Sequence, residues 1–186
     1  MLVLAGSAGL TSCATSTSGQ AVPDQGQATG ATGRPSDEPS ARPTSGNPQA
    51  GNSPMEETDP CALLDAAAKA KLDISGAGEN RKIGVARGCR WRVRGAGESQ
   101  IFDVGILDTA GITDIPATVR VEKLPNIGAH QAVQGKEQGG GPGGCTIILG
   151  VTGSSRVDLN VLAGNDTQKA CDLVMELATL VEPKLP

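Results

Sequence analysis

Apolar residues recur at helical spacing in the stretch that begins at Asp59. The carboxylate of Asp59 can accept hydrogen bonds from the free N–H groups of a first turn, and Pro60 suits the first helical position. The apolar positions that follow share one helix face, and they are Cys61, Leu64, Ala68 and Leu72. The pattern predicts a helix that ends near Ile74, ahead of Ser75 and Gly76.

In residues 89–94, apolar residues and arginines alternate strictly, in contrast to the helical spacing of the preceding segment. Cys89, Trp91 and Val93 fall on one face of this segment, and three arginines fall on the other. Alternation of this kind is typical of a half-buried strand. Apolar runs between turn signals predict further strands at residues 101–107, 118–124, 129–134, 145–151 and 156–162. The last two are expected to form a hairpin that turns at residues 153–154.

A second helix is predicted near the C-terminus, over residues 166–181. Six apolar side chains of this segment are expected to face the core, and they are Ala170, Leu173, Val174, Leu177, Leu180 and Val181. The order of helix, several antiparallel strands and helix predicts an α+β fold. In this fold, an N-terminal and a C-terminal helix pack on one antiparallel sheet, and disulfides are expected to staple them together.

The N-terminal part of the chain follows neither period. Residues 14–57 consist largely of Ser, Thr, Gly, Pro, Gln and Ala, with almost no large apolar side chain. Such a stretch buries too little surface to offset the entropy lost on ordering, so we expect residues 13–58 to form a disordered tether. A flexible coil of this length spans roughly 35–40 Å. The folded domain is accordingly expected at residues 59–186.

An export signal is expected at residues 1–12. Residues 2–10 form an apolar run that is shorter than the roughly 20 residues of a membrane-spanning helix, and it is typical of the hydrophobic region of a signal peptide. The next residues end in Leu-Thr-Ser-Cys at Cys13, a pattern that resembles a lipobox. The resemblance implies cleavage before Cys13 and attachment of diacylglycerol to its sulfur. The protein is then expected to be lipid-anchored on the extracytoplasmic face of the cell membrane.

One feature departs from this pattern, because no Lys or Arg precedes Cys13. Signal peptides carry a positively charged N-terminal region. We therefore expect the true translation start to lie upstream. The alternative is an apolar N-terminus that is never processed, with Cys13 as an unmodified thiol.

Composition limits the classes of function. The 186 residues include 26 Gly and 12 Pro, with one Phe, one Trp and no Tyr, so the core must be built from Val, Ile, Leu and Ala. The formal net charge of -4 comes from mixed signs and provides no basic surface for nucleic acid. The shortage of aromatic side chains also removes stacking platforms for single strands, so no nucleic-acid partner is expected.

Four cysteines remain when Cys13 is set aside, and an even number in an exported chain predicts two disulfides. Three pairings are possible, and the sequence does not choose between them. We favour Cys61–Cys89 with Cys145–Cys171, because each pair would join a helix to a strand. A metal site is the alternative. The chain has no CxxC pair and a single histidine, however, so no metal or other cofactor is expected.

Few residues are candidates for chemistry. His130 has no accompanying motif such as GxSxG or HExxH, so we expect no catalytic residue and no enzymatic activity. The glycine-rich residues 139–144 lack the Lys-Ser/Thr of a phosphate-binding loop and predict a flexible connection. Trp91 could stack on a sugar, but its place in the alternating strand favours the core. The residues at the hairpin turn, Ser154 and Ser155, are assigned no chemistry.

Short motifs along residues 59–186 together resemble one family. They are Asp59-Pro60-Cys61-Ala62-Leu63-Leu64, Cys89-Arg90-Trp91, residues 128–133, Cys145, Ala170-Cys171 and Glu182-Pro183-Lys184-Leu185-Pro186. The series resembles the actinobacterial lipoproteins of domain of unknown function 3558. The resemblance implies a cell-envelope lipoprotein with paired cysteines, and it implies no catalytic residue and no established activity.

Two functions from different classes fit these features. The first is a non-enzymatic binding module that holds a small apolar or lipid ligand in a pocket between helices and strands. The second is a structural or regulatory module that docks another envelope protein through a basic strand face. That face would consist of Arg87, Arg90, Arg92 and Arg94, although a solvated strand face explains these arginines equally well. A hydrolase is a third possibility, disfavoured by the missing motifs.

Overall fold

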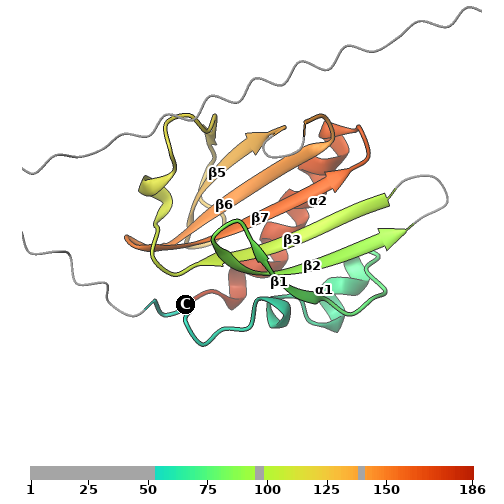
Figure 1. Ribbon diagram of the computed structural model, residues 1–186, viewed down its shortest axis with the longest axis horizontal. Helices are drawn as coiled ribbons and strands as arrows, with labels where there is room; N and C mark the ends of the chain where they lie inside the picture. The colour runs from blue at the N-terminus through green and yellow to red at the C-terminus, as the bar shows by residue number, and fades with distance from the viewer. Residues whose placement is uncertain (1–52, 95–98, 138–140) are drawn as a thin grey trace, which may run out of the picture. The chain divides into compact units, whose positions relative to one another are not determined.

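The computed structural model describes residues 53–94, 99–137 and 141–186. Within them, the domain consists of a seven-stranded antiparallel sheet with helical segments against one face (Figure 1). The strands are β1 (Glu79–Ile83), β2 (Ala86–Arg94), β3 (Ser99–Leu107), β4 (Glu122–Lys123), β5 (Gln131–Lys136), β6 (Gly144–Thr152) and β7 (Ser155–Ala163). The helices are α1 (Ala66–Lys71) and α2 (Thr167–Val181), with 3-10 turns η1 (Pro60–Leu63), η2 (Ile112–Asp114) and η3 (Glu182–Lys184). The predicted α+β fold is confirmed.

The sheet is made of two meanders that meet at its centre. Its strand order is β1-β2-β3-β7-β6-β5-β4, so β7 pairs with β3 although β4, β5 and β6 come between them in the chain. Phe102 of β3 lies opposite Val161 of β7 at this junction. The predicted hairpin of β6 and β7 is confirmed, with its turn between Thr152 and Ser155.

The hydrophobic core lies between one face of the sheet and the helical segments. Helix α2 covers β6 and β7, and the turn η1 covers β2 and β3. Trp91 is only 2% exposed, so its predicted place in the core is confirmed. Phe102, Leu159 and Leu177 are fully buried. Close packing of this kind fills the space between helix and sheet.

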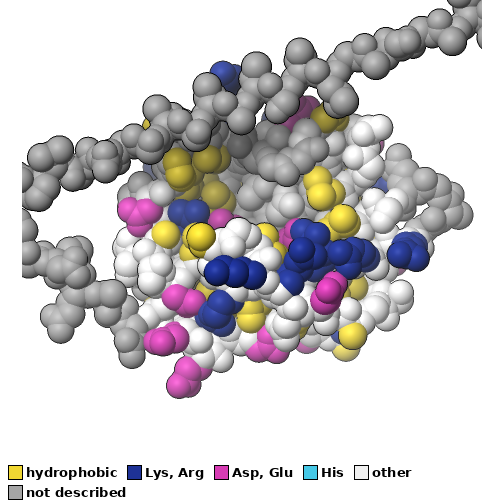
Figure 2. Space-filling model, viewed as in Figure 1, with side chains coloured by type: hydrophobic (Ala, Val, Ile, Leu, Met, Phe, Trp, Pro, Cys, Tyr) yellow, Lys and Arg dark blue, Asp and Glu magenta, His cyan; other side chains and the backbone are white. Residues whose placement is uncertain are grey.

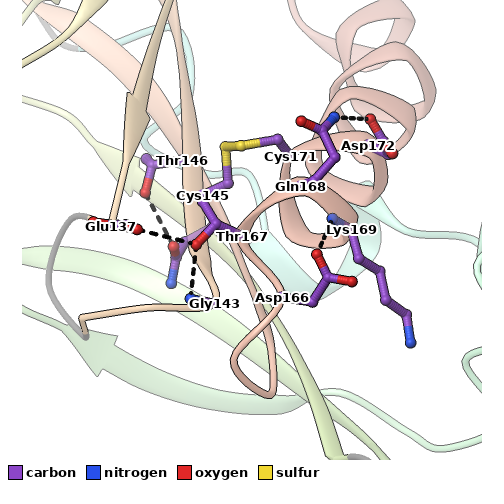
Figure 3. Close-up of a disulfide and its surroundings, with 11 residues drawn as sticks. Glu137, Gly143, Cys145, Thr146, Asp166, Thr167, Gln168, Lys169, Cys171 and Asp172 are labelled. Atoms are coloured by element: carbon purple, nitrogen blue, oxygen red, sulfur yellow. Dashed lines mark hydrogen bonds between the residues drawn. A yellow bond between two sulfur atoms is a disulfide. The ribbon is translucent and has the colours of Figure 1, made fainter.

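Two disulfides join helical segments to strands. Cys61 of η1 pairs with Cys89 of β2, and Cys145 of β6 pairs with Cys171 of α2. This is the pairing that the sequence analysis favoured. In Figure 3, the second bridge lies above the start of α2, where Asp166 accepts a hydrogen bond from the N–H of Lys169. The chain-entropy model gives each loop, 28 and 26 residues long, about 3–4 kcal/mol of stabilisation.

The N-terminal helical region differs from the single helix expected from the spacing. It is divided into η1 and α1, with Leu64 in an extended conformation between them. Asp59 caps the first piece by accepting from the N–H of Cys61, and Asp65 caps the second by accepting from the N–H of Ala68. Asp65 is thus a second N-cap residue, at which one helical segment ends and the next begins. The regular apolar spacing across this segment hid the break that Asp65 indicates.

Two strand predictions also need correction. Strand β1 was not predicted, because its sequence Glu-Asn-Arg-Lys-Ile is polar and it occupies an edge of the sheet. The strand expected at residues 118–124 is reduced to the two residues of β4 at the other edge. Edge strands bury less surface and carry more charge, so their apolar pattern is weak.

The packed part of the chain begins earlier than the sequence suggested. Residues 53–58 were assigned to the tether, but Met55 is 1% exposed and belongs to the hydrophobic core. One thioether side chain in a polar stretch gives no periodic signal, which explains the difference. The expected signal peptide, Cys13 and the tether up to residue 52 lie outside the described residues.

Candidate functional site

An open groove of about 640 Å³ lies between residues 57–60 and the β1–β2 hairpin. Its walls are formed by residues 57–60, 80–82 and 85–88, and we call it the hairpin groove. In Figure 1, the segment before η1 runs beside this hairpin. Both walls are short segments of chain. The positions of their side chains therefore depend on the contacts that hold the two segments together.

Arg87 joins the two walls. Its guanidinium donates hydrogen bonds of 2.8 Å to the main-chain oxygens of Met55 and Thr58. It also donates to both carboxylate oxygens of Asp108, and this hydrogen-bonded cation holds the pKa of Asp108 below its usual value. All three nitrogens of Arg87 are thereby used in holding residues 53–58 against β2.

The place of Arg87 corrects the expected basic stripe. In an antiparallel strand, side chains two residues apart share a face, so Arg87 lies on the same face as Cys89 and the core. Arg90, Arg92 and Arg94 lie on the opposite face, as predicted. The stripe of four arginines is therefore divided between the two faces of the sheet.

The hairpin groove combines an apolar surface with charged borders. Its apolar side chains are Pro60, Val85 and Ala86, and Gly88 adds bare main chain. Val85 sits in the hairpin turn after Gly84, which has a positive φ of 59°, and it is 83% exposed. Val85 is thus a solvent-exposed aliphatic side chain at the border of the groove.

Charged residues line the groove on both walls. Arg81 and Lys82 belong to the hairpin wall, while Glu57 and Asp59 belong to the opposite wall. Arg81 has an additional property, because its Nε is buried and has no hydrogen-bond partner in the described part of the chain. By the strand register, Arg81 shares the sheet face of Gly88 and Arg90, whereas Asn80 contacts Cys61 on the opposite face, so the Arg81 side chain points away from residues 57–60.

The face of the sheet away from the helices carries paired charges. Figure 2 shows Lys and Arg side chains gathered over β1 and β2 on this face. Arg90 binds Asp103 with two hydrogen bonds, the one from Nε being 2.6 Å long. Arg92 binds Glu79 at 2.9 Å. Each of these two arginines thus has its own carboxylate, which reduces the free positive charge of the face.

His130 is held by two acceptors. Its Nδ1 lies 2.9 Å from Oε1 of Glu182, and its Nε2 lies 3.2 Å from the main-chain oxygen of Pro186. The N–H of Ala129 donates to the same Glu182 oxygen at 2.8 Å, and these hydrogen bonds hold the pKa of Glu182 below its usual value. Both ring nitrogens lie within hydrogen-bonding distance of an oxygen, so these contacts hold the imidazole in place.

A recess of about 480 Å³ adjoins His130 and includes Thr113 and Thr152. The hydroxyl of Thr152 is hydrogen-bonded to that of the fully buried Ser155 at 2.7 Å. Among the described residues, the hydrogen bonds of His130 reach no hydroxyl or thiol.

The end of the chain joins two motif segments that are distant in sequence. Lys184 donates to the main-chain oxygen of Leu63 at 2.8 Å and binds the carboxylate of Asp65 at 2.9 Å. Glu182 binds Ala129 and His130, as described above. The 3-10 turn η3 therefore connects the region of η1 with the approach to β5.

A family model matches residues 8–184 of the chain, and its description is "Protein of unknown function (DUF3558)". The chain belongs to the DUF3558 family. The comparison with curated proteins found no match, and the comparison with solved structures found none. The matched residues contain the two disulfides, the hairpin groove and the contacts made by η3.

The structure places the remaining candidate residues of this DUF3558 domain. Residues 138–140 of the glycine-rich segment lie outside the described residues, and the N–H of Gly143 donates to the hydroxyl of Thr167 at 3.0 Å. No cluster of potential metal ligands occurs in the described part of the chain. A search of the same residues finds no helix long and apolar enough to cross a membrane.

Sequence reasoning did not single out the hairpin groove of this DUF3558 protein. Arg81, Lys82 and Val85 were given no role, because they belong to an edge hairpin that was not predicted. The available signal was the sequence Ile83-Gly84-Val85-Ala86, in which a glycine separates two apolar residues as in a tight turn. It is recognisable only once β1 is known to be a strand.

Proposed function

We propose that this protein is an extracytoplasmic lipoprotein whose folded domain is a non-catalytic binding module for a small apolar or lipid ligand. The hairpin groove carries this proposal. Its volume of about 640 Å³ lies within the range of small-molecule sites, roughly 300–1,000 Å³. An apolar surface with a few charged groups at its border is also usual for such sites.

The place proposed for the ligand differs from the one expected from the sequence. A pocket between helices and strands was expected, but Phe102, Val174 and Leu177 fill that space and are fully buried. A ligand there would have to displace core side chains. The hairpin groove needs no such rearrangement, since it is open to solvent at the edge of the sheet.

The proposed localisation rests on the N-terminal sequence. Acylation of Cys13 and the polar segment that follows it would hold the domain near the membrane surface, where lipids are abundant. Two disulfides are consistent with an oxidising compartment. The proposed absence of catalysis is supported by His130, whose ring nitrogens both hold structural partners.

The alternative is a structural or regulatory module that docks an envelope protein through the arginine face. The pairs Arg90–Asp103 and Arg92–Glu79 weaken this alternative, because each arginine is already neutralised within the domain. A partner would have to compete with these carboxylates. The geometry therefore favours the hairpin groove as the binding surface.

Native mass spectrometry of the protein extracted from membranes tests the proposal. We expect a non-covalent adduct that is absent under denaturing conditions. Val85→Asp should reduce its occupancy at least about tenfold, because it introduces a charge into the apolar part of the groove. Met175→Asp is the matched control, since Met175 is the other exposed large apolar side chain among the described residues and lies on α2. Equal loss in both variants, or no adduct in the wild type, would contradict the proposal.

A further inference from the structure

We infer that His130 forms a pH-sensitive clasp, which holds residues 185–186 more firmly when its imidazole is protonated than when it is neutral. The observation behind this inference is that both ring nitrogens face oxygen atoms. Nδ1 lies 2.9 Å from Oε1 of Glu182, and Nε2 lies 3.2 Å from the main-chain oxygen of Pro186. The clasp borders the recess beside His130, so the inference does not depend on a ligand in the hairpin groove.

Both of these oxygens can only accept a hydrogen bond. A main-chain oxygen carries no proton. The Ala129 N–H and then the imidazole hold the pKa of Glu182 below its usual value, which keeps the carboxylate ionised. A neutral imidazole carries one N–H, so it can donate to one acceptor and turns a lone pair toward the other. An imidazolium carries two N–H groups and satisfies both, so the two oxygens match the protonated ring.

The charged groups around His130 favour the same state. Glu182 is the one charged side chain bound to the imidazole within the described part of the chain. Lys184, in the same turn η3, is bound to Asp65 instead. Asp114 of η2 accepts from the main chain of its own turn. The recess is otherwise lined by uncharged residues of η2, β5 and β6, so protonation places a positive charge beside one carboxylate and opposite no cation of the lining.

The clasp acts on the segment that follows η3. The N–H of Leu185 donates to the main-chain oxygen of Glu182 at 3.0 Å, and the Leu185 side chain packs against the core. Pro186 comes next, and it lines the recess of about 480 Å³ together with His130. When the ring is neutral, one of the two contacts lacks its hydrogen bond, so residues 185–186 are held less firmly. The recess changes with pH because Pro186 forms part of its wall.

Urea unfolding at pH 5.5 and pH 8 tests the clasp, because imidazoles change their charge between about pH 5 and 8. The protein is the full chain carrying Cys13→Ser, exported through an oxidising compartment and made without a histidine tag. His130 is then its only histidine. His130→Gln should raise the unfolding constant at least about tenfold more at pH 5.5 than at pH 8, the difference expected for a charged hydrogen bond. The stabilisation is present while the ring is protonated and is lost as the pH rises and the proton leaves.

Hydrogen exchange at the Leu185 N–H gives a local measurement of the same clasp. After correction for the intrinsic pH dependence of exchange, its protection should be greater at pH 5.5 than at pH 8 when His130 is present. In His130→Gln the protection should be equal at the two pH values, because a glutamine amide does not titrate in this range. A histidine that only fills space would give no pH difference in either chain.

Two further variants separate the clasp from general electrostatics. Glu182→Gln should abolish the pH difference in stability, because the amide can donate to a neutral ring and accept from a protonated one. Asp65→Asn is the matched control. It breaks the neighbouring ion pair with Lys184, and Asn can still cap α1, so the pH difference should be unchanged.

Each contrary outcome would overturn the inference. Equal effects of His130→Gln at pH 5.5 and pH 8 would show that protonation does not strengthen the contact. A pH difference that remains in Glu182→Gln would show that the carboxylate is not its source. Loss of the pH difference in Asp65→Asn would assign the effect to the charges around η3 in general.

Discussion

The carboxylate of Glu182 and the imidazole of His130 lie 2.9 Å apart, although 52 residues separate them in the sequence. The pair is mostly buried, with 14% of the Glu182 side chain and 9% of the His130 side chain exposed. It ties the turn after α2 to the start of β5, on the side of the sheet away from β1. The contact therefore fixes the end of the chain against the second meander.

This contact predicts a pH dependence of stability. The pKa of Glu182 is lower in the folded protein, first because of the Ala129 N–H and then because of His130. A lowered pKa means that the stabilisation is present above the unfolded pKa of Glu182 and is lost as the pH falls through the folded value. Glu182→Gln should reduce the free energy of unfolding at pH 7 by about 1–2 kcal/mol. Urea unfolding at pH 7 and pH 3 checks this, and an equal loss at both would contradict it.

Gly128 should be intolerant of a side chain because of Glu182. It has a positive φ of 56°, and a Cβ built there overlaps the Glu182 carboxylate. Gly128→Ala should destabilise by about 1–3 kcal/mol through backbone strain and steric conflict. In a double-mutant cycle, Glu182→Ala should relieve the steric part, so the combined loss should be smaller than the sum of the single losses. Strict additivity would show that the conflict is absent.

The two arginine–carboxylate pairs on the sheet should differ in their contribution to stability. Asp103 is 2% exposed and Arg90 shields it, so Arg90→Gln leaves a buried carboxylate and should cost about 3–5 kcal/mol. Arg92→Gln breaks a pair whose side chains are 47% and 61% exposed, and it should cost at most about 1 kcal/mol. Chemical unfolding of both variants makes the comparison. Similar losses would mean that burial does not determine the contribution of these pairs.

The two disulfides should differ in their accessibility to a reductant. Cys61 is only partly buried, whereas Cys145 is 0% exposed and Cys171 is 6% exposed. Reduction requires access to a sulfur atom, so a mild phosphine should open Cys61–Cys89 first. Alkylation followed by peptide mass spectrometry would identify the labelled cysteines. Labelling of Cys145 and Cys171 at the same rate would contradict this order.

The elements that were predicted correctly are those in which burial of one face makes apolar residues recur at regular spacing. Alternation at Cys89, Trp91 and Val93 identified β2, and the apolar face of residues 166–181 identified α2. Burial is what links residue type to position in such segments. Strand β1 has no buried side chain, so its polar sequence contains no comparable signal.

The candidate site was not predictable for a related reason. The hairpin groove depends on where residues 57–60 lie relative to β1, and that placement comes from Arg87 reaching Met55 and Thr58. A hydrogen bond between residues 29 or more positions apart leaves no trace in local patterns.

Strand β7 lies at the centre of the sheet but is the last strand in the sequence. During synthesis from the N-terminus, the other strands are therefore available before the strand that joins them. Strand β3 can pair with β2 early, but its other edge stays unsatisfied until residues 155–163 arrive. Until then the first meander presents an open edge to any neighbouring strand, which is a route to aggregation. Completion of the sheet must therefore wait until nearly the whole chain is available. A chain that ends after β6 would leave both meanders without the strand that joins them.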